Sequence, residues 1–238
     1  MAISKITDML LRNSLFAGLS AAELDALTKL LRQSDLKTRS VVCHQGDPGN
    51  SFYVVLSGLL KVVTASEDGH EVVLSMLGPG MTFGELALLD GKPRSASVIA
   101  CQASTIATID RHNFNQFLTH FPETRDKLIV ALCGRIRTLT DRVEDLSALE
   151  VPARLARTLI TLSETLGSEL QGKRYVHARI SQGEIGSMVG AARESINKIM
   201  RQWEDKGIIC IVDGRVQILR PDALAGISQQ GDSGSLLK

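Results

Sequence analysis

Two short segments of the chain contain the side chains best suited to chemistry. In the first, residues 83–97 read FGELALLDGKPRSAS. The carboxylate of Glu85 can accept hydrogen bonds from sugar hydroxyls, and the planar guanidinium of Arg94 suits a phosphate. Gly84 lets a ligand approach the backbone, and a helix starting at residue 85 would point free N–H groups at an anion. These residues suit a nucleotide site, but their spacing equally suits an ion pair between Glu85 and Arg94 in a surface loop, and both interpretations stay open here.

The second segment, residues 191–203, reads AARESINKIMRQW and has the pattern of a recognition helix. Its apolar side chains share one helical face: Ile196, Ile199, Met200 and Trp203. Its polar side chains share the opposite face: Arg193, Glu194, Asn197 and Lys198. In a helix-turn-helix, the first turn of such a helix enters the major groove of DNA.

The polar face of this helix has the chemistry of base recognition. Arg193 can donate two hydrogen bonds to guanine, and Glu194 can accept one from cytosine N4. Lys198, one turn later, can reach a base or a phosphate. Backbone amides near Ser181 and Gln182, at the start of the preceding helix, could hold a phosphate. Two alternatives stay open: the first turn is an ordinary solvated helix start, or the motif serves only in contacts between proteins.

Short strands are the elements that would position the first segment. Leucines at residues 10, 11 and 15 indicate a helical start, and Ser20 with Glu23 forms a capping box before a second helix. Apolar runs separated by turn signals then predict strands at residues 40–45, 51–56, 59–64, 71–77, 95–100 and 104–110. This number and spacing of strands favours an antiparallel barrel or sandwich.

Apolar side chains repeat every seven residues between Glu123 and Glu150. The a positions are Ile129, Ile136 and Val143, and the d positions are Leu132, Leu139 and Leu146. β-Branched residues at a and leucine at d favour a parallel two-stranded coiled coil. We therefore expect a long dimerisation helix, although three heptads also suit a helix that packs on its own domain.

The C-terminal third has the element order of a winged helix-turn-helix. A strand is expected at 175–180, and Ser181 with Glu184 forms a second capping box at the start of a helix. The recognition helix follows. The pair Asp213-Gly214 then suits the tight turn of a β-hairpin.

Composition excludes several classes of protein. The chain has 238 residues, of which 44% are hydrophobic and 22% charged, so a folded core is expected and wholesale disorder is excluded. A net charge of +1 argues against purely electrostatic binding of nucleic acid, although residues 151–238 hold 12 Lys and Arg against 9 Asp and Glu. No stretch suits a membrane span or a secretory signal, which predicts a cytoplasmic protein. The cysteines are too scattered for a zinc site: Cys43, Cys101, Cys133 and Cys210.

Both segments resemble those of one bacterial family, the cAMP receptor protein and fumarate–nitrate regulator (CRP/FNR) family. GELALL with RSAS, within residues 84–97, resembles its phosphate-binding cassette, and ISQGEIGSMVGAARESINK, residues 180–198, resembles its DNA-reading unit. The resemblance covers roughly residues 10–225 and is strongest to the branch that binds cyclic nucleotides. It implies a regulator that binds cAMP or cGMP and switches a homodimer to operator binding, with RNA polymerase as a further partner.

The resemblance also implies roles for individual residues. Glu85 would bind the ribose 2′-hydroxyl, and Arg94 would bind the cyclic phosphate. The full set of implied ligand contacts is Val62, Leu74, Gly84, Glu85, Leu86, Ala87, Arg94, Ser95, Leu139 and Thr140. The implied DNA contacts are Ser181, Gln182, Arg193, Glu194, Asn197 and Lys198.

The chain departs from the cyclic-nucleotide branch at two points. Lys198 stands where that branch has an arginine, and a lysine cannot reproduce a bidentate fork. Leu139 and Thr140 stand where the branch has two hydroxyl residues that touch the adenine, so the purine stays open between cAMP and cGMP. Iron–sulfur members use an N-terminal cysteine cluster, whereas the first cysteine here is Cys43; a heme sensor would need axial ligands, for which His44, His70 and His112 exist.

Together these features predict an α+β fold with four parts. They are a β-barrel (jelly-roll) domain with flanking helices over residues 1–122, a dimerisation helix over 123–150, a winged helix-turn-helix over 151–227, and a disordered tail over 228–238. No cofactor, metal or catalytic residue is expected. The alternatives are a regulator with a vestigial pocket or another effector, a module that does not bind DNA, and a cyclic-nucleotide phosphodiesterase, which would need metal ligands that the sequence does not show.

Overall fold

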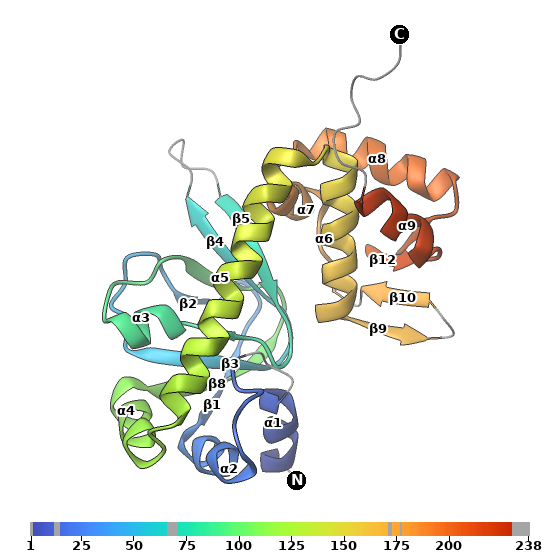
Figure 1. The fold of residues 1–238 in the computed structure, drawn as a ribbon. Coiled ribbons are helices and arrows are strands. Elements are labelled where there is room, and N and C mark those ends of the chain that lie inside the picture. The colour runs from blue at the N-terminus through green and yellow to red at the C-terminus, as the bar shows by residue number, and fades with distance from the viewer. Residues whose placement is uncertain (1, 12–14, 66–70, 171–172, 177, 230–238) are drawn as a thin grey trace. The chain divides into compact units, whose positions relative to one another are not determined.

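The computed structural model describes residues 2–11, 15–65, 71–170, 173–176 and 178–229 (Figure 1). The predicted tail, apart from Ser228 and Gln229, and His70 lie outside these residues. The chain forms two compact units, Met1–Thr138 and Leu139–Lys238, and helix α5 (Thr124–Ala148) contributes residues to both. Each unit is described by itself.

Two four-stranded antiparallel sheets form the centre of the first unit (Figure 1). One sheet has the order β1 (Arg32–Leu36), β8 (Ser104–Asp110), β3 (Ser51–Ser57) and β6 (Thr82–Phe83). The other has the order β2 (Val41–Cys43), β7 (Ser97–Ala100), β4 (Leu60–Ala65) and β5 (Glu71–Leu77). Both sheets supply side chains to one apolar core, which includes Val55, Leu60, Phe83, Val98 and Ile106. This confirms the expected β-rich, jelly-roll type of domain.

Helices pack at one end of this unit around a second apolar core. They are α1 (Ala2–Leu11), α2 (Ala21–Leu30), α4 (Arg111–His120) and the first turns of α5. The ring of Phe52 on β3 lies edge-on to Phe16 at 5.4 Å and stacked with Phe114 at 6.3 Å between centroids. Phe52 is thus one of the side chains through which the sheet packs on the helices, together with Val54, Ala107 and Ile109.

Glu23 joins the N-terminal helices to the start of α5. It completes the predicted capping box of α2, since Ser20 Oγ accepts from the Glu23 N–H while Glu23 accepts from the Ser20 N–H. The same carboxylate accepts hydrogen bonds from Thr124 Oγ1 and Lys127 Nζ, each at 2.7 Å. Burial raises the pKa of Glu23, but hydrogen bonds from Lys127, Ser20 and Thr124 outweigh it and lower that pKa to about 2.

The second unit is a winged helix-turn-helix, as predicted. It contains α6 (Val151–Thr165), β9 (Gly167–Leu170), β10 (Lys173–Val176), α7 (Gln182–Val189), α8 (Arg193–Asp205), β11 (Ile209–Val212), β12 (Arg215–Ile218) and α9 (Pro221–Ser228). Its sheet has the order β11-β12-β10-β9. Asp213 and Gly214 both have positive φ, 51° and 72°, which is the backbone of the predicted tight hairpin turn. The core gathers Leu155, Leu159, Ile185, Ile196 and Met200.

Several elements differ from the sequence-based expectation. β1, β6, β9 and α9 were not expected, and the strand predicted over 175–180 is instead β10, which ends at Val176. β1 has the sequence RQSDL and exposed side chains except at its last residue, so it lacks the alternation that marks a strand. Its pairing with β8 defines it. Ile199, expected to be buried, is only partly buried.

Among the described residues, no helix combines the length and apolar character that crossing a membrane requires. The same part of the chain holds no group of three His, Cys, Asp or Glu side chains placed to bind a metal ion. The four cysteines all lie among the described residues, and none of them forms a disulfide bond.

Candidate nucleotide and DNA sites

Gly84 shapes the first candidate site by its backbone. It is the N-cap of the short helix α3 (Glu85–Asp90) and has the left-handed φ of +83°. A Cβ atom at this position would lie 2.5 Å from Arg94 Nη1 and 2.9 Å from the Ser51 carbonyl oxygen. Glycine is therefore required both by conformation and by the closeness of Arg94.

Arg94 is a buried cation without an acidic partner. Only 5% of the residue is exposed to solvent. Its Nη1 donates to the carbonyl oxygen of Gly84 at 3.1 Å, and its Nη2 donates to that of Ser51 at 2.7 Å. The guanidinium also lies over the ring of Tyr53, 5.3 Å from the centroid. Within the described part of the chain, its buried Nε has no hydrogen-bond partner and no carboxylate forms an ion pair with it. A buried positive charge held only by neutral groups can accept an anion at low cost, because the anion supplies the missing partner.

Glu85, the next residue after Gly84, pairs with a different arginine. Its Oε1 accepts from Arg135 Nη1 of α5 at 2.6 Å, and Arg135 Nη2 donates to Thr82 Oγ1 at 3.1 Å. The alternative of a Glu85–Arg94 ion pair is therefore wrong. Both side chains nevertheless lie at the start of α3, since Arg94 donates to the carbonyl that precedes Glu85.

Arg135 is a residue that sequence reasoning missed. It occupies a position that flanks the a/d pattern of the long helix, and only its contact with Glu85, 50 residues earlier, connects it to the site. Charge at such a flanking position is ordinary in a coiled coil. No local signal distinguished Arg135 from the other arginines of α5.

The remaining predicted ligand residues lie around α3 and on two neighbouring strands. Ala87 is buried, and its carbonyl accepts from Arg111 Nη2 at 2.5 Å, whereas Ser95 and Leu86 are exposed. Val62 on β4 is half-buried, and Leu74 on β5 is 45% exposed at an irregularity between the two strands. Their contacts with a ligand stay predictions.

Most of the predicted a and d side chains of α5 face solvent in the single chain. More than half of the surface is exposed for Ile129, Ile136, Leu139, Val143 and Leu146. Leu132 differs, because it packs partly against the core of its own unit. Leu139 and Thr140 belong to the second unit, so their part in the nucleotide site stays a prediction.

The second candidate site is the exposed face of α8 with the start of α7. Ser181 and Glu184 form the predicted capping box, which fixes the first turn of α7. Arg193, Glu194 and Lys198 are exposed. The polar face continues beyond the predicted set with the exposed side chains of Arg201, Gln202 and Asp205. Asn197 is half-buried, and its Nδ2 donates to Gln182 Oε1 at 2.8 Å.

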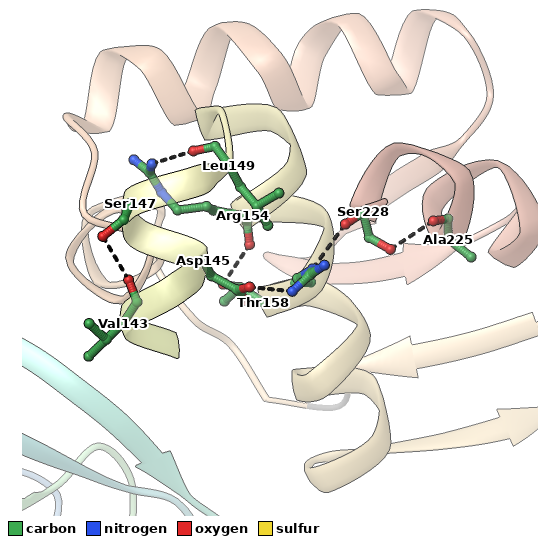
Figure 2. Close-up of polar contacts among 9 residues, drawn as sticks. Val143, Asp145, Ser147, Leu149, Arg154, Thr158, Ala225 and Ser228 are labelled. Carbon is green, nitrogen blue, oxygen red and sulfur yellow. Dashed lines mark hydrogen bonds and ion pairs between the residues drawn. The ribbon is translucent and has the colours of Figure 1, made fainter. Parts of the chain in front are cut away.

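Two arginines of α6 hold the elements of the second unit together, and Figure 2 shows the contact of one of them, Arg154, with Leu149. Arg154 donates to the carbonyl of Leu149 (2.7 Å) at the end of α5 and to that of Val189 (2.9 Å) at the end of α7. Arg157 donates to the carbonyl of Ser228 in α9 (2.9 Å) and pairs with Asp145 of α5. Arg154 thereby bridges the end of the long helix to the end of α7, and Arg157 bridges it to α9.

Two family models match the chain. Residues 33–121 match the cyclic nucleotide-binding domain, and residues 153–227 match the Crp-like helix-turn-helix domain. The first covers the site built around α3, and the second covers the face of α8.

Curated relatives match most of the chain. The CRP-like cAMP-activated global transcriptional regulator of Mycobacterium tuberculosis is 31% identical over 218 residues, which cover 92% of this chain and 97% of that protein. The cAMP-activated global transcriptional regulator CRP of Escherichia coli is 31% identical over 173 residues, covering 72% and 82%. The first of these matches extends over nearly the full length of both proteins.

Solved structures share the fold. A CRP/FNR family transcriptional regulator from Thermus thermophilus is 26% identical with a TM-score of 0.66, covering 84% of this chain and 99% of its own. FixK2 from Bradyrhizobium japonicum, at 18% identity, has the same fold with a TM-score of 0.74 and covers 84% and 98%.

Proposed function

The chain belongs to the CRP/FNR family of transcription regulators, and from that premise we propose that it is a dimeric regulator whose DNA binding is switched by a cyclic nucleotide. The nucleotide binds at the start of α3, and the exposed face of α8 contacts an operator. The two relatives described above are named as cAMP-activated, which makes cAMP the first ligand to test. cGMP remains the alternative purine, because Leu139 carries no hydroxyl.

The observation that carries the nucleotide proposal is the buried guanidinium of Arg94. It has a spare donor, Nε, and its other donors are held by two neutral carbonyls. A cyclic phosphate carries one negative charge and two free oxygens, which suit a planar guanidinium better than carbonyl dipoles do. Charge-assisted hydrogen bonds are roughly twice as strong as neutral ones, so the phosphate can displace the carbonyl contacts.

Glu85 supplies the sugar contact in this proposal. Within the described residues its Oε1 is engaged by Arg135, and Oε2 accepts no hydrogen bond. Oε2 can therefore accept from the ribose 2′-hydroxyl while the ion pair with α5 persists. Through Arg135 the bound ribose would act on the long helix.

The DNA-binding part of the proposal rests on exposure and charge. Arg193, Glu194 and Lys198 lie exposed on α8, the helix that enters the major groove in this motif. The exposed apolar row of α5 would bury itself against a second copy of the chain, which gives two recognition helices for two half-sites. Because its proposed target is an operator, we expect the protein to act in the cytoplasm. A contact with RNA polymerase is a further prediction. A catalytic role is not proposed.

The test compares the parent chain with Arg94→Ala and Arg94→Lys by calorimetric titration with cAMP and with cGMP. We expect one nucleotide to bind the parent, Arg94→Ala to lose binding by at least tenfold, and Arg94→Lys to recover part of it, because a lysine keeps the charge without the fork. Lys92→Ala is the matched control, since it removes an exposed positive charge two residues away. Its affinity should stay within twofold of the parent.

The same samples are then assayed for DNA binding, using duplexes selected from a random pool with the parent protein. The proposal requires that the bound nucleotide raise DNA affinity. Binding of DNA that no cyclic nucleotide changes would support instead a regulator with a vestigial pocket or another effector. Equal titration heats for the parent and Arg94→Ala would show that this cradle is not the nucleotide site.

A further inference from the structure

The side chain of Asn197 is directed toward the preceding helix. Its Nδ2 donates to Oε1 of Gln182 at 2.8 Å, across 15 residues of sequence and between α8 and α7. Both residues are half-buried, unlike their exposed neighbours Arg193, Glu194 and Lys198. An asparagine that reads adenine uses both ends of its amide on one base. One end of the Asn197 amide is already engaged by protein.

In this contact the Gln182 amide accepts through its oxygen. A primary amide has its oxygen and its amino group on opposite sides of the same carbon. With Oε1 accepting from Asn197, the amino group Nε2 is turned away from Asn197, and Gln182 stands at the first position of α7. The backbone beneath it is held by the capping box of Ser181 and Glu184. Gln182 therefore presents two N–H donors from a fixed position.

An outward amide N–H next to the recognition helix can donate a hydrogen bond to the DNA backbone. Half or more of all hydrogen bonds between proteins and DNA go to phosphate and sugar oxygens, which accept and cannot donate. If the amide were reversed, Oε1 would face the phosphates and repel them. By holding Oε1 of Gln182 inward, Asn197 thus determines whether the Gln182 side chain favours or opposes DNA binding.

We propose that Asn197 is a positioning residue that acts through Gln182: it orients the Gln182 amide so that Nε2 donates to a backbone phosphate of the operator. Asn197 then contributes to affinity for every sequence and does not select a base. The inference rests on the proposed binding of DNA by this domain and deepens it. It separates Asn197 in role from Arg193 and Glu194, which remain the proposed base contacts.

A double-mutant cycle tests this coupling in the full-length chain. Asn197→Ala, Gln182→Ala and the double variant are titrated, with the activating nucleotide where one is needed, onto the selected duplex. Loss of one hydrogen bond from a neutral amide to a charged phosphate corresponds to roughly tenfold or more weaker binding per half-site. We expect this loss in each single variant and no further loss from Asn197→Ala when residue 182 is already alanine.

Two further readouts distinguish positioning from base reading. Asn197→Ala should weaken binding by the same factor on duplexes that carry single base-pair changes across the site. It should also leave the salt dependence unchanged, because a neutral amide releases no counterion. Lys198→Ala is the matched control on the same helix face, and its effect should add in full to that of Gln182→Ala. Alanine is also the better helix former, so thermal unfolding should show no loss of stability.

Additive effects of Asn197→Ala and Gln182→Ala, or a loss confined to one base pair, would overturn this inference while leaving the proposed function intact. A parent chain that binds no duplex from the pool, with or without nucleotide, would overturn the proposed DNA binding and this inference together.

Discussion

At the scale of single residues, the buried charges of Arg94 and Glu23 in the first unit differ in their hydrogen-bond partners. Among the residues that the structure describes, Arg94 has neutral partners only, whereas Glu23 accepts from Ser20, Thr124 and Lys127. The unsatisfied charge belongs to the proposed ligand site. The satisfied one joins elements of the fold, because Thr124 and Lys127 lie 101 and 104 residues away in sequence.

Replacing Glu23 by glutamine should destabilise the protein by about 2 kcal/mol at pH 7, since a hydrogen bond to a charged group contributes roughly 1.5–3 kcal/mol. The pKa of Glu23 is lowered to about 2 from its ordinary 4.5. A lowered pKa stabilises the folded state above the ordinary value and loses that effect as the pH falls toward the folded-state value. The difference in stability between parent and Glu23→Gln should therefore be full above about pH 4.5 and shrink toward pH 2.

Urea unfolding of both proteins at several pH values measures this difference. Glu123→Gln, an exposed neighbour next to Thr124, is the control and should be within about 0.5 kcal/mol of the parent, the range of surface substitutions. A difference that stays constant between pH 7 and pH 3 would mean that the carboxylate charge plays no part in the contact.

At the scale of elements, the long helix α5 has two kinds of surface. In its first turns Thr124 and Leu128 are buried, while the later apolar side chains of the row, apart from the partly buried Leu132, are exposed in the single chain. A row of exposed aliphatic side chains on one face of a 25-residue helix is unfavourable in water unless a partner covers it. The heptad spacing indicates that the partner is a second α5.

Ile136→Glu should convert the proposed dimer to a monomer, because it places a charge at the middle a position of this row. The measurement is the mass in solution by light scattering, which should fall to the 25.8 kDa of one chain. Gly134→Glu is the matched control: it adds the same side chain to the same helix, at a position where a Cβ meets nothing within 4 Å. A chain that keeps twice this mass after Ile136→Glu would have its dimer contact elsewhere.

At the scale of the whole molecule, the proposed nucleotide site and the proposed DNA-binding face are coupled through the helix α5. Arg135 connects α5 to Glu85 in the first unit, and Arg154 and Arg157 connect the end of α5 and α6 to the helix-turn-helix in the second. Coupling between two ligands is reciprocal in free energy. The nucleotide and the operator must therefore change each other's affinity by the same factor.

The corresponding prediction is quantitative. If the nucleotide raises operator affinity by a factor between about 5 and 150, the operator should raise nucleotide affinity by an equal factor. Titrations of nucleotide in the presence and absence of saturating duplex check this. Arg135→Ala should reduce the factor in both directions. Unequal factors at equilibrium would show that the two measurements do not report one coupled transition.

Features that depend on neighbours in sequence were predictable from the chain alone. The capping boxes at Ser20 and Ser181 and the turn at Asp213-Gly214 occur where expected, because each is decided within about four residues. The long helix and the recognition helix follow from periodicity. The two motifs that carry the chemistry were recognisable for the same reason, since each is one continuous segment.

Features that depend on contacts between distant segments were decided only by the tertiary structure. β1 is a strand because β8 pairs with it, 70 residues away at Asp35 and Thr105. Glu85 pairs with Arg135 rather than Arg94 because α5 packs beside α3, and Arg94 donates to the Ser51 carbonyl because β3 lies next to it. Residue types and spacing specify which partners a side chain can take, whereas the choice among them is made by proximity in the folded chain, where burial makes an unpaired charge costly.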